Sequence, residues 1–211
     1  MKLVVDMSEV TKLQSRLALL PVELKDRAIA AALNRTAEKA RTEVDRAIRA
    51  EYVISSERVR SSVSLRRASA QRFDFEASLS IFGSPSKRGR SMNVIAFMEK
   101  KTTLAQARRR AKNNDLFVVG RRGQLLPILR FVFKRGSGPK TIEGAFVGNK
   151  GRTVFRRVGK ARLPIEPIRV IDVGQMFRSK KVSPRVLDRI RRDLPVELDR
   201  AAKAVMARLG T

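Results

Sequence analysis

The chain contains no cysteine, no histidine and no tryptophan, and it has a single tyrosine among its 211 residues. The absence of cysteine excludes disulfide bonds and thiolate chemistry. The absence of histidine removes the usual general base near neutral pH and leaves metal ligation to carboxylates alone. We therefore expect a protein that is not an enzyme and that holds neither a metal nor a cofactor.

Long apolar runs are also missing. No uninterrupted apolar segment approaches the roughly 20 residues that a membrane-spanning helix needs. The short apolar run at residues 1–5 is followed by Asp6 and Glu9, so it is too short and too charged for a signal peptide. We therefore expect a protein that is made and kept in the cytoplasm, without a membrane partner.

Positive charge is what the chain has in excess. It contains 47 Lys and Arg against 20 Asp and Glu, a formal net charge of +27. Residues 83–160 hold 20 of these basic residues and only three acids, so this segment carries +17 of the total. Charge concentrated in this way attracts polyanions and acidic surfaces. We expect this part of the molecule to meet one or the other.

Apolar periodicity predicts helices near both ends of the chain. Apolar residues recur every three, four or seven positions over residues 22–50, which predicts one long helix with a charged opposite face. Shorter helices are predicted at residues 8–20 and 55–61. An amphipathic helix is predicted from residue 183 onward, with a kink or a restart at Pro195. We expect the long helix to pack on a sheet, and a coiled coil with a partner is the alternative.

Alternation with a period of two predicts antiparallel strands in the rest of the chain. The predicted strands are residues 2–5, 63–68, 72–82, 94–98, 116–119, 128–134, 141–147, 153–158 and 163–171. The sequence thus predicts an α+β fold, in which a long N-terminal helix and a C-terminal helix pack on an antiparallel β-sheet. We expect a single domain over residues 1–211, with an extended basic loop or arm at about 83–114.

Residues 154–166 read Val-Phe-Arg-Arg-Val-Gly-Lys-Ala-Arg-Leu-Pro-Ile-Glu, and residues 173–177 read Val-Gly-Gln-Met-Phe. These segments resemble the minor tail protein Z family of long-tailed bacteriophages and prophages. Members carry a strand of the form Phe-x-Arg-x-Gly-Lys-x-Arg-Leu-Pro-Ile, followed by a helix near a Gln-Met pair. Ala-Leu-Asn-Arg-Thr-Ala at residues 32–37, the later Arg41, and Phe-Val-Gly-Asn at residues 146–149 also resemble the family.

The resemblance implies a structural virion protein of the neck or tail, which completes the head-proximal end of the tail as part of a ring. The implied partners are further copies of itself, with a hexamer expected by analogy with six-fold tails, and neighbouring neck and tail proteins. The residues that match the motif, and that we expect between subunits, are Phe155, Arg156, Arg157, Gly159, Lys160, Arg162, Leu163, Pro164, Gln175 and Met176. At residues 167–172, Pro-Ile-Arg-Val-Ile-Asp replaces the family's aromatic, glycine-containing turn.

Strand alternation places Phe155 and Arg157 on one face of the motif strand, and Arg156 and Val158 on the other. A strand with two mixed faces fits a boundary between subunits. The alternative is an edge hairpin whose arginines are simply solvated. Pro164 cannot donate a ladder hydrogen bond, so we expect the strand to bend or to become an edge there.

Nine basic residues are candidate contacts to DNA phosphates: Lys87, Arg88, Arg90, Arg108, Arg109, Arg110, Lys112, Arg121 and Arg122. Such point charges neutralise a phosphate backbone without reading bases. Few aromatic residues lie near them, so duplex DNA in a channel fits better than a single strand. The alternative is that they meet acidic residues of a neighbouring tail protein.

Two functions remain open at this point. The first is a virion component that forms a ring at the neck or tail and helps to join head and tail around the DNA channel. The alternative is a freestanding, sequence-nonspecific nucleic-acid-binding protein, whose affinity would fall steeply between roughly 50 and 200 mM salt. For the carboxylates near the C-terminus, ordinary ion pairing with neighbouring arginines explains their pattern without a metal site. These carboxylates are Asp172, Asp188, Asp193, Glu197 and Asp199.

Overall fold

A computed structural model describes residues 2–3, 22–82, 92–99, 117–119, 125–127, 129–159 and 162–209. They group into two compact units. The helical unit is built from the described parts of Met1–Glu51, Ser56–Gly89 and Asp172–Thr211, and the strand unit from those of Tyr52–Ser55 and Arg90–Ile171. The helical unit therefore combines segments from both sides of the strand unit in the sequence. The single domain expected from the sequence remains a prediction.

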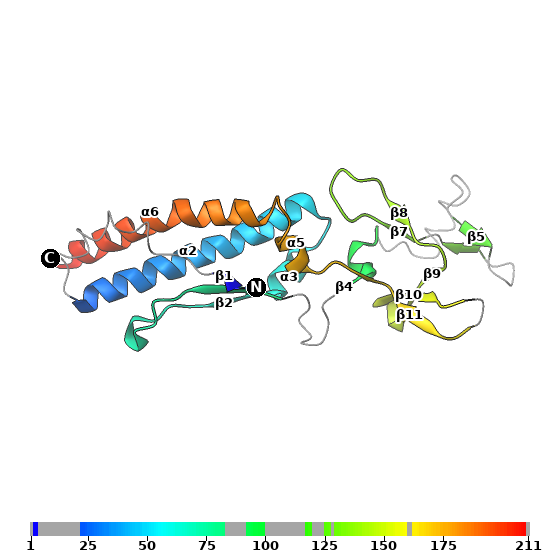
Figure 1. The fold of residues 1–211 in the computed structure, drawn as a ribbon, viewed down its shortest axis with the longest axis horizontal. Helices are drawn as coiled ribbons and strands as arrows, with labels where there is room; N and C mark the ends of the chain where they lie inside the picture. Colours follow the sequence, from blue (N-terminus) through cyan, green and yellow to red (C-terminus); the bar gives the residue numbers. More distant parts are fainter. Residues whose placement is uncertain are drawn as a thin grey trace. The chain divides into compact units, whose positions relative to one another are not determined.

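Two long helices, α2 (Val22–Glu51) and α6 (Ser183–Leu209), lie side by side and antiparallel in the helical unit (Figure 1). An acidic residue in the first turn of α2 and a basic one in its last turn complement the helix dipole. The structure confirms both helices. α6 continues through Pro195 as one helix, without a restart there.

The core between these helices is rich in alanine. Leu33 of α2 and Leu194 and Leu198 of α6 are its larger members, and all three are buried. The smaller members are Ala28, Ala30, Ala32, Ala37, Ala201 and Ala202 of the two helices, together with Ala68 and Ala77, which lie outside both helices. Small side chains allow close approach of the helix backbones. The long helix therefore packs on α6 as well as on the strands expected from the sequence.

Buried carboxylates along the helix pair have basic partners. Glu197 is 1% exposed, and its Oε1 lies 2.5 Å from Lys39 Nζ across the interface. Arg185 donates to the buried Glu43 over 2.8 Å. An unpaired buried charge would be strongly destabilising, so these pairs fix how α2 faces α6. Within α6, Asp188, Asp193 and Glu197 pair with Arg191, Arg189 and Arg200, which confirms the ion-pairing interpretation of these acids.

A β-hairpin packs beside the two helices. It joins β2 (Val63–Arg66) to β3 (Ser78–Ile81), and β1 (Lys2–Leu3) pairs with the other edge of β3. All pairings are antiparallel. The helix α3 (Ser56–Ser61) precedes the hairpin, as predicted.

The strand predicted at residues 72–82 is too long. The 3-10 turn η2 (Ala70–Arg72) occupies its beginning, and Phe73 adopts a left-handed backbone conformation with φ 50°. The backbones of Ser69 and Asp74 hydrogen-bond to each other on either side of this turn. The side-chain pattern of residues 72–77 therefore belongs to the tip of the hairpin.

The strand unit consists of short antiparallel pairings, as the sequence predicts. One sheet has three strands in the order β11-β10-β9, and the other strands form the pairs β12-β4, β5-β6 and β7-β8. The bounds are β4 (Met92–Asn93), β5 (Phe117–Val119), β6 (Leu125–Pro127), β7 (Arg130–Phe131), β8 (Lys140–Thr141), β9 (Ala145–Gly148), β10 (Thr153–Arg157), β11 (Ile165–Pro167) and β12 (Arg169–Val170). The core of the unit includes the fully buried side chains of Val94, Phe131 and Val154.

Several predicted strands differ in the structure. The strand predicted at 94–98 is wrong, because Val94–Phe97 forms the 3-10 helix η3, which the Asn93 side chain caps by accepting from Ile95 N. The strand predicted at 141–147 is interrupted by a turn in which Gly144 has φ +69°. The one predicted at 163–171 divides into β11 and β12, and the one at 128–134 shortens to β7.

Part of the predicted basic arm belongs to the core of the strand unit. Residues 92–99 form β4 and η3, and Val94 and Phe97 are fully buried. Residues 83–91 and 100–114 of the arm lie outside the described residues, as does the helix predicted at residues 8–20.

Candidate interaction surface

The nine candidate phosphate contacts all lie outside the described residues. They are Lys87, Arg88, Arg90, Arg108, Arg109, Arg110, Lys112, Arg121 and Arg122. Lys160 of the family motif lies outside them as well. The structure does place the hairpin of β10 and β11, and it also places Gln175 and Met176.

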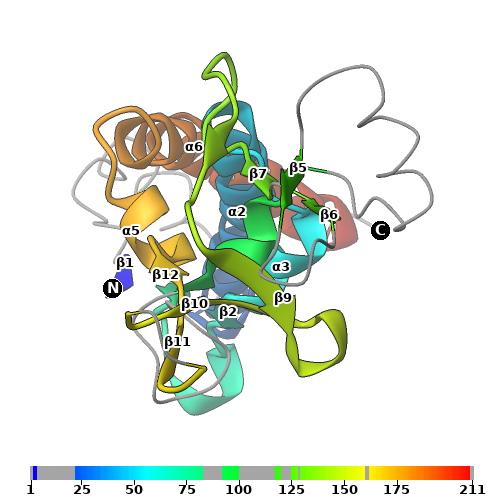
Figure 2. The same cartoon turned by 90° about the vertical axis from the view of Figure 1, so that its right-hand side faces the viewer.

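β10 is the central strand of its sheet and carries the motif residues Phe155 and Arg157 (Figure 2). Phe155 lies opposite Phe146 of β9, and the two rings stack with their centres 6.0 Å apart. The guanidinium carbon of Arg157 lies 5.2 Å from the centre of the same Phe146 ring. The structure thus confirms that Phe155 and Arg157 share a face. A Cβ at Gly148 would meet the Phe155 ring at 3.0 Å, so any other residue at the end of β9 would require that ring to shift.

The opposite face of β10 is anchored in the core. Val154 is fully buried and packs with Val94 and Phe131. The Asn93 side chain donates to the carbonyl of Val154 over 3.1 Å and accepts from its N–H over 3.0 Å. The Val154 carbonyl also accepts from Ile168 N over 3.0 Å, so both backbone groups of Val154 have partners. The motif strand is therefore held firmly at its base.

The far end of the hairpin is exposed. Gly159 has φ +102°, a conformation that favours glycine, which gives a physical reason for the motif glycine. Arg157 Nη1 donates to the carbonyl of Arg162 over 2.6 Å, and Val158 N donates to the carbonyl of Pro164 over 3.1 Å. Leu163 is 66% exposed, the largest fraction among the large hydrophobic side chains described on this hairpin.

The hairpin combines apolar and cationic surface. Val158 and Ile165 are exposed beside Leu163. Among the described residues, neither Arg156 nor Arg162 has an ion-pair partner, although many arginines of the helical unit do. Exposed apolar side chains beside arginines without a described ion-pair partner suit a contact with another protein subunit.

Gln175 and Met176 of the motif lie in the helical unit, in the short helix α5 (Val173–Phe177). Met176 is fully buried there. Asp172 accepts from Gln175 N over 2.7 Å, and the Gln175 side chain accepts from Asp172 N over 3.1 Å. These two residues therefore start and anchor a helix, and the structure gives them a role in folding.

The carboxylates of α6 pair with arginine and lysine side chains. Asp193 accepts a hydrogen bond from Arg189 over 2.6 Å, and this bond, together with the Asp193 charge, raises the pKa of Arg189. In the ranges that the structure describes, no three acidic side chains gather closely enough to hold a metal ion. The described helices also include none that is long and apolar enough to span a membrane.

Three residues of these surfaces were not singled out by the sequence reasoning. Asn93 contacts Val154 across 61 positions of sequence, which no local pattern reveals. Phe146 was noted only as part of a matching segment. Phe73 falls within the strand predicted at residues 72–82, and no signal in its neighbours predicts a left-handed conformation for phenylalanine.

Comparison with known families gives one match, which covers nearly the whole chain. The sequence model of the family described as "Prophage minor tail protein Z (GPZ)" matches residues 14–209. No curated protein and no solved structure matches the chain.

Proposed function

The chain belongs to the prophage minor tail protein Z family, and on this premise we propose that it forms a ring at the head-proximal end of the tail and helps to join head to tail. Membership alone makes it a structural protein of the phage tail, found in the virion. The match over residues 14–209 is the observation that carries the proposal. We further propose that the chain is not an enzyme and that it resides in the host cytoplasm until it is assembled.

The β10–β11 hairpin supports a contact between copies. Within the described residues, β9 and β11 each pair on one side only, and an unpaired strand edge can extend a neighbour's sheet. Val158, Leu163 and Ile165 are exposed beside the edge of β11. A head-to-tail contact of this kind closes into a ring when the rotation between copies permits. Six copies are expected by analogy with tail symmetry.

The basic segment at residues 83–160 supports a place beside the DNA channel. Each copy contributes +17 from this segment, so six copies would concentrate about +100 in one ring. We propose that these charges meet duplex DNA in the channel or acidic surfaces of the flanking rings. Both uses need many basic groups and no base recognition.

Deletion of the gene from an inducible prophage tests the proposal. We expect filled heads and separate tails in electron micrographs of the induced culture, and joined particles when the chain is supplied in trans. The mass of chain per isolated tail then gives the copy number. Joined, infectious particles without the chain would refute the role in joining, and copies scattered along the tail would refute the ring.

The alternative is a freestanding nucleic-acid-binding protein, favoured only by the charge of the middle segment. It requires that the isolated chain binds DNA as a monomer, with affinity that collapses between roughly 50 and 200 mM salt. A virion component instead sediments with tails at physiological salt. Sedimentation of the chain with tails and with DNA fragments separates the two functions.

A further inference from the structure

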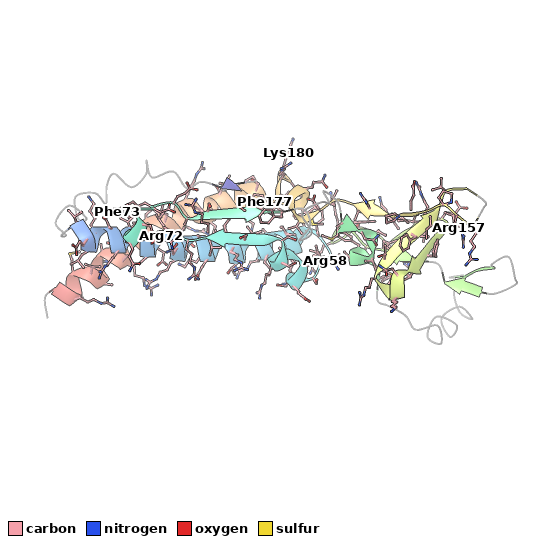
Figure 3. All side chains as sticks on the ribbon, turned by 90° about the horizontal axis from the view of Figure 1, so that it is seen from below. Arg58, Arg72, Phe73, Arg157, Phe177 and Lys180 are labelled. Atoms are coloured by element: carbon pink, nitrogen blue, oxygen red, sulfur yellow. The ribbon has the colours of Figure 1, made fainter. Side chains whose placement is uncertain are left out.

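Phe73 stands at the tip of the β2–β3 hairpin, where it is 77% exposed, the largest fraction among the large hydrophobic side chains that the structure describes as exposed. Figure 3 shows it beside Arg72 at this tip. The tip lies in the helical unit and belongs to none of the segments used above. Because most of the Phe73 side chain is in contact with solvent, burial of its apolar area contributes little to the stability of its own chain.

The backbone of Phe73 is in a conformation that disfavours phenylalanine. Its φ of 50° and ψ of 30° lie in the left-handed region, where glycine and asparagine are the usual residues. Strained backbone of this kind is concentrated at functional sites. A glycine or asparagine would suit the turn better, so the fold itself does not explain why an aromatic ring is placed here.

The turn that carries Phe73 is closed by its own hydrogen bonds. Ser69 N donates to the Asp74 carbonyl over 2.7 Å, and Asp74 N donates back to the Ser69 carbonyl over 3.0 Å. Phe73 N donates to the Ala70 carbonyl over 3.2 Å. Arg66 pairs with the Asp74 carboxylate below the turn.

The base of the tip is fastened to α2. The Asn34 side chain donates to the carbonyl of Ala68 over 3.0 Å and accepts from its N–H over 2.8 Å. Arg67 pairs with Glu38 of the same helix. The exposed ring is therefore held in place before any partner arrives, which lowers the entropic cost of binding.

The three arginines near the tip differ in whether they form an ion pair. Arg66 and Arg67 have carboxylate partners, whereas Arg72 has none among the described residues and is exposed. Arginine beside an aromatic residue is the composition typical of energetically dominant interface contacts. Arg72 is therefore available to pair with a carboxylate of a partner protein, since no described residue of the chain pairs with it.

We propose that Phe73 and Arg72 form a plug that inserts into an apolar pocket, rimmed by carboxylates, on a different protein of the tail. The proposal rests on the tail role proposed above and names the partner's chemistry. A second copy is disfavoured, because the chain carries +27 and many of its described carboxylates already pair with its own arginines and lysines. Duplex DNA is disfavoured because two of the three arginines at the tip are neutralised.

Phe73→Asn separates binding from folding, because asparagine tolerates the left-handed conformation. We expect its thermal midpoint to equal or exceed that of the wild type. Tails from the deletion prophage, mixed with purified chain and sedimented, should need at least a tenfold higher concentration of Phe73→Asn than of wild type for half-saturation. Arg72→Glu should weaken binding similarly, and Arg72→Lys should weaken it less. Phe82→Asn is the matched control, since Phe82 is 51% exposed and follows the last residue of β3.

The outcomes distinguish this plug from the proposed function. Wild-type chain that does not sediment with tails refutes the tail role and the plug with it. Wild-type and Phe73→Asn chains that bind equally refute the plug alone. If Phe73→Asn loses self-association in sedimentation velocity, or loses binding to a DNA duplex while it retains binding to tails, the proposed partner is wrong. A lower thermal midpoint for Phe73→Asn would show that the ring supports the fold.

Discussion

The guanidinium group of Arg157 covers the ring of Phe146, with 5.2 Å between the guanidinium carbon and the ring centre. The contact joins β10 to β9, and Phe155 stacks on the same ring. Both partners of Phe146 belong to the motif strand by which the chain resembles its family. Phe146 therefore stabilises the arrangement of Phe155 and Arg157 on that face of β10.

Phe146→Ala should lower the free energy of unfolding by about 1–3 kcal/mol, because it removes the ring that stacks on Phe155 and that the Arg157 guanidinium group covers. Urea unfolding followed by circular dichroism measures the loss. Phe146→Tyr keeps the ring and should unfold close to the wild type. Equal stability of the alanine variant would show that the stack contributes nothing.

Arg156 and Arg162 provide a test of the assembly surface. Charge reversal to Glu at both positions should change stability by about 0.5 kcal/mol or less per site, since both side chains are exposed and have no described ion-pair partner. The number of copies per tail, and the yield of joined particles, should fall. Lysine at both positions is the control. Normal particle yield with both charges reversed would place the subunit contact elsewhere.

Asn93→Ala should destabilise the strand unit by about 2 kcal/mol, because the N–H of Val154 would lose its side-chain acceptor and η3 would lose its cap, while the Val154 carbonyl would keep Ile168 N as its donor. Thermal unfolding measures the change. Asn93→Asp keeps the acceptor and loses the donor, so its thermal midpoint should lie between those of the wild type and of Asn93→Ala. An unchanged midpoint for the alanine variant would mean that water replaces the amide.

Leu33→Asp should prevent folding of the helical unit, because a carboxylate would be buried without a partner between α2, α6 and the hairpin. Ile190→Asp on α6 should have the same effect. Arg41→Asp on the exposed side of α2 is the control and should fold. Soluble Leu33→Asp protein with the wild-type midpoint would contradict the helix pairing.

Arg108, Arg109 and Arg110 lie outside the described residues, and their replacement by Ala should leave the thermal midpoint unchanged. If they contact DNA phosphates, the slope of log affinity against log salt should fall in magnitude by about 3. Titration of a labelled duplex at several salt concentrations measures the slope. An unchanged slope would favour acidic protein surfaces as their partners.

The sequence predicts the long elements well and the short ones poorly. Apolar residues recur regularly over many turns of α2 and α6, so each apolar position strengthens the prediction of the helix. Val94–Phe97 and the turn before Phe73 are decided by contacts with distant residues, such as Asn93 with Val154 and Asn34 with Ala68. No window of sequence contains such pairs. By contrast, the spacing of Asp172 and Gln175 is a capping-box pattern that the sequence does display, and it was missed.

In the candidate site, too, the features set by local pattern could be predicted, and those set by packing between distant segments could not. The motif strand and the shared face of Phe155 and Arg157 could be predicted, because alternation along a strand is a local property. The role of Phe146 and the burial of Met176 could not, since both depend on which segments pack together.

The helical unit joins segments that are separated by more than eighty residues of the strand unit, Arg90–Ile171. During synthesis on the ribosome, α2 emerges long before α6, the helix that covers its alanine-rich stripe. The strand unit has all of its sequence available earlier and can fold first. A nonsense mutation before Ser183 would therefore release a polypeptide with an uncovered helix face, prone to aggregation or proteolysis, even if every strand were complete.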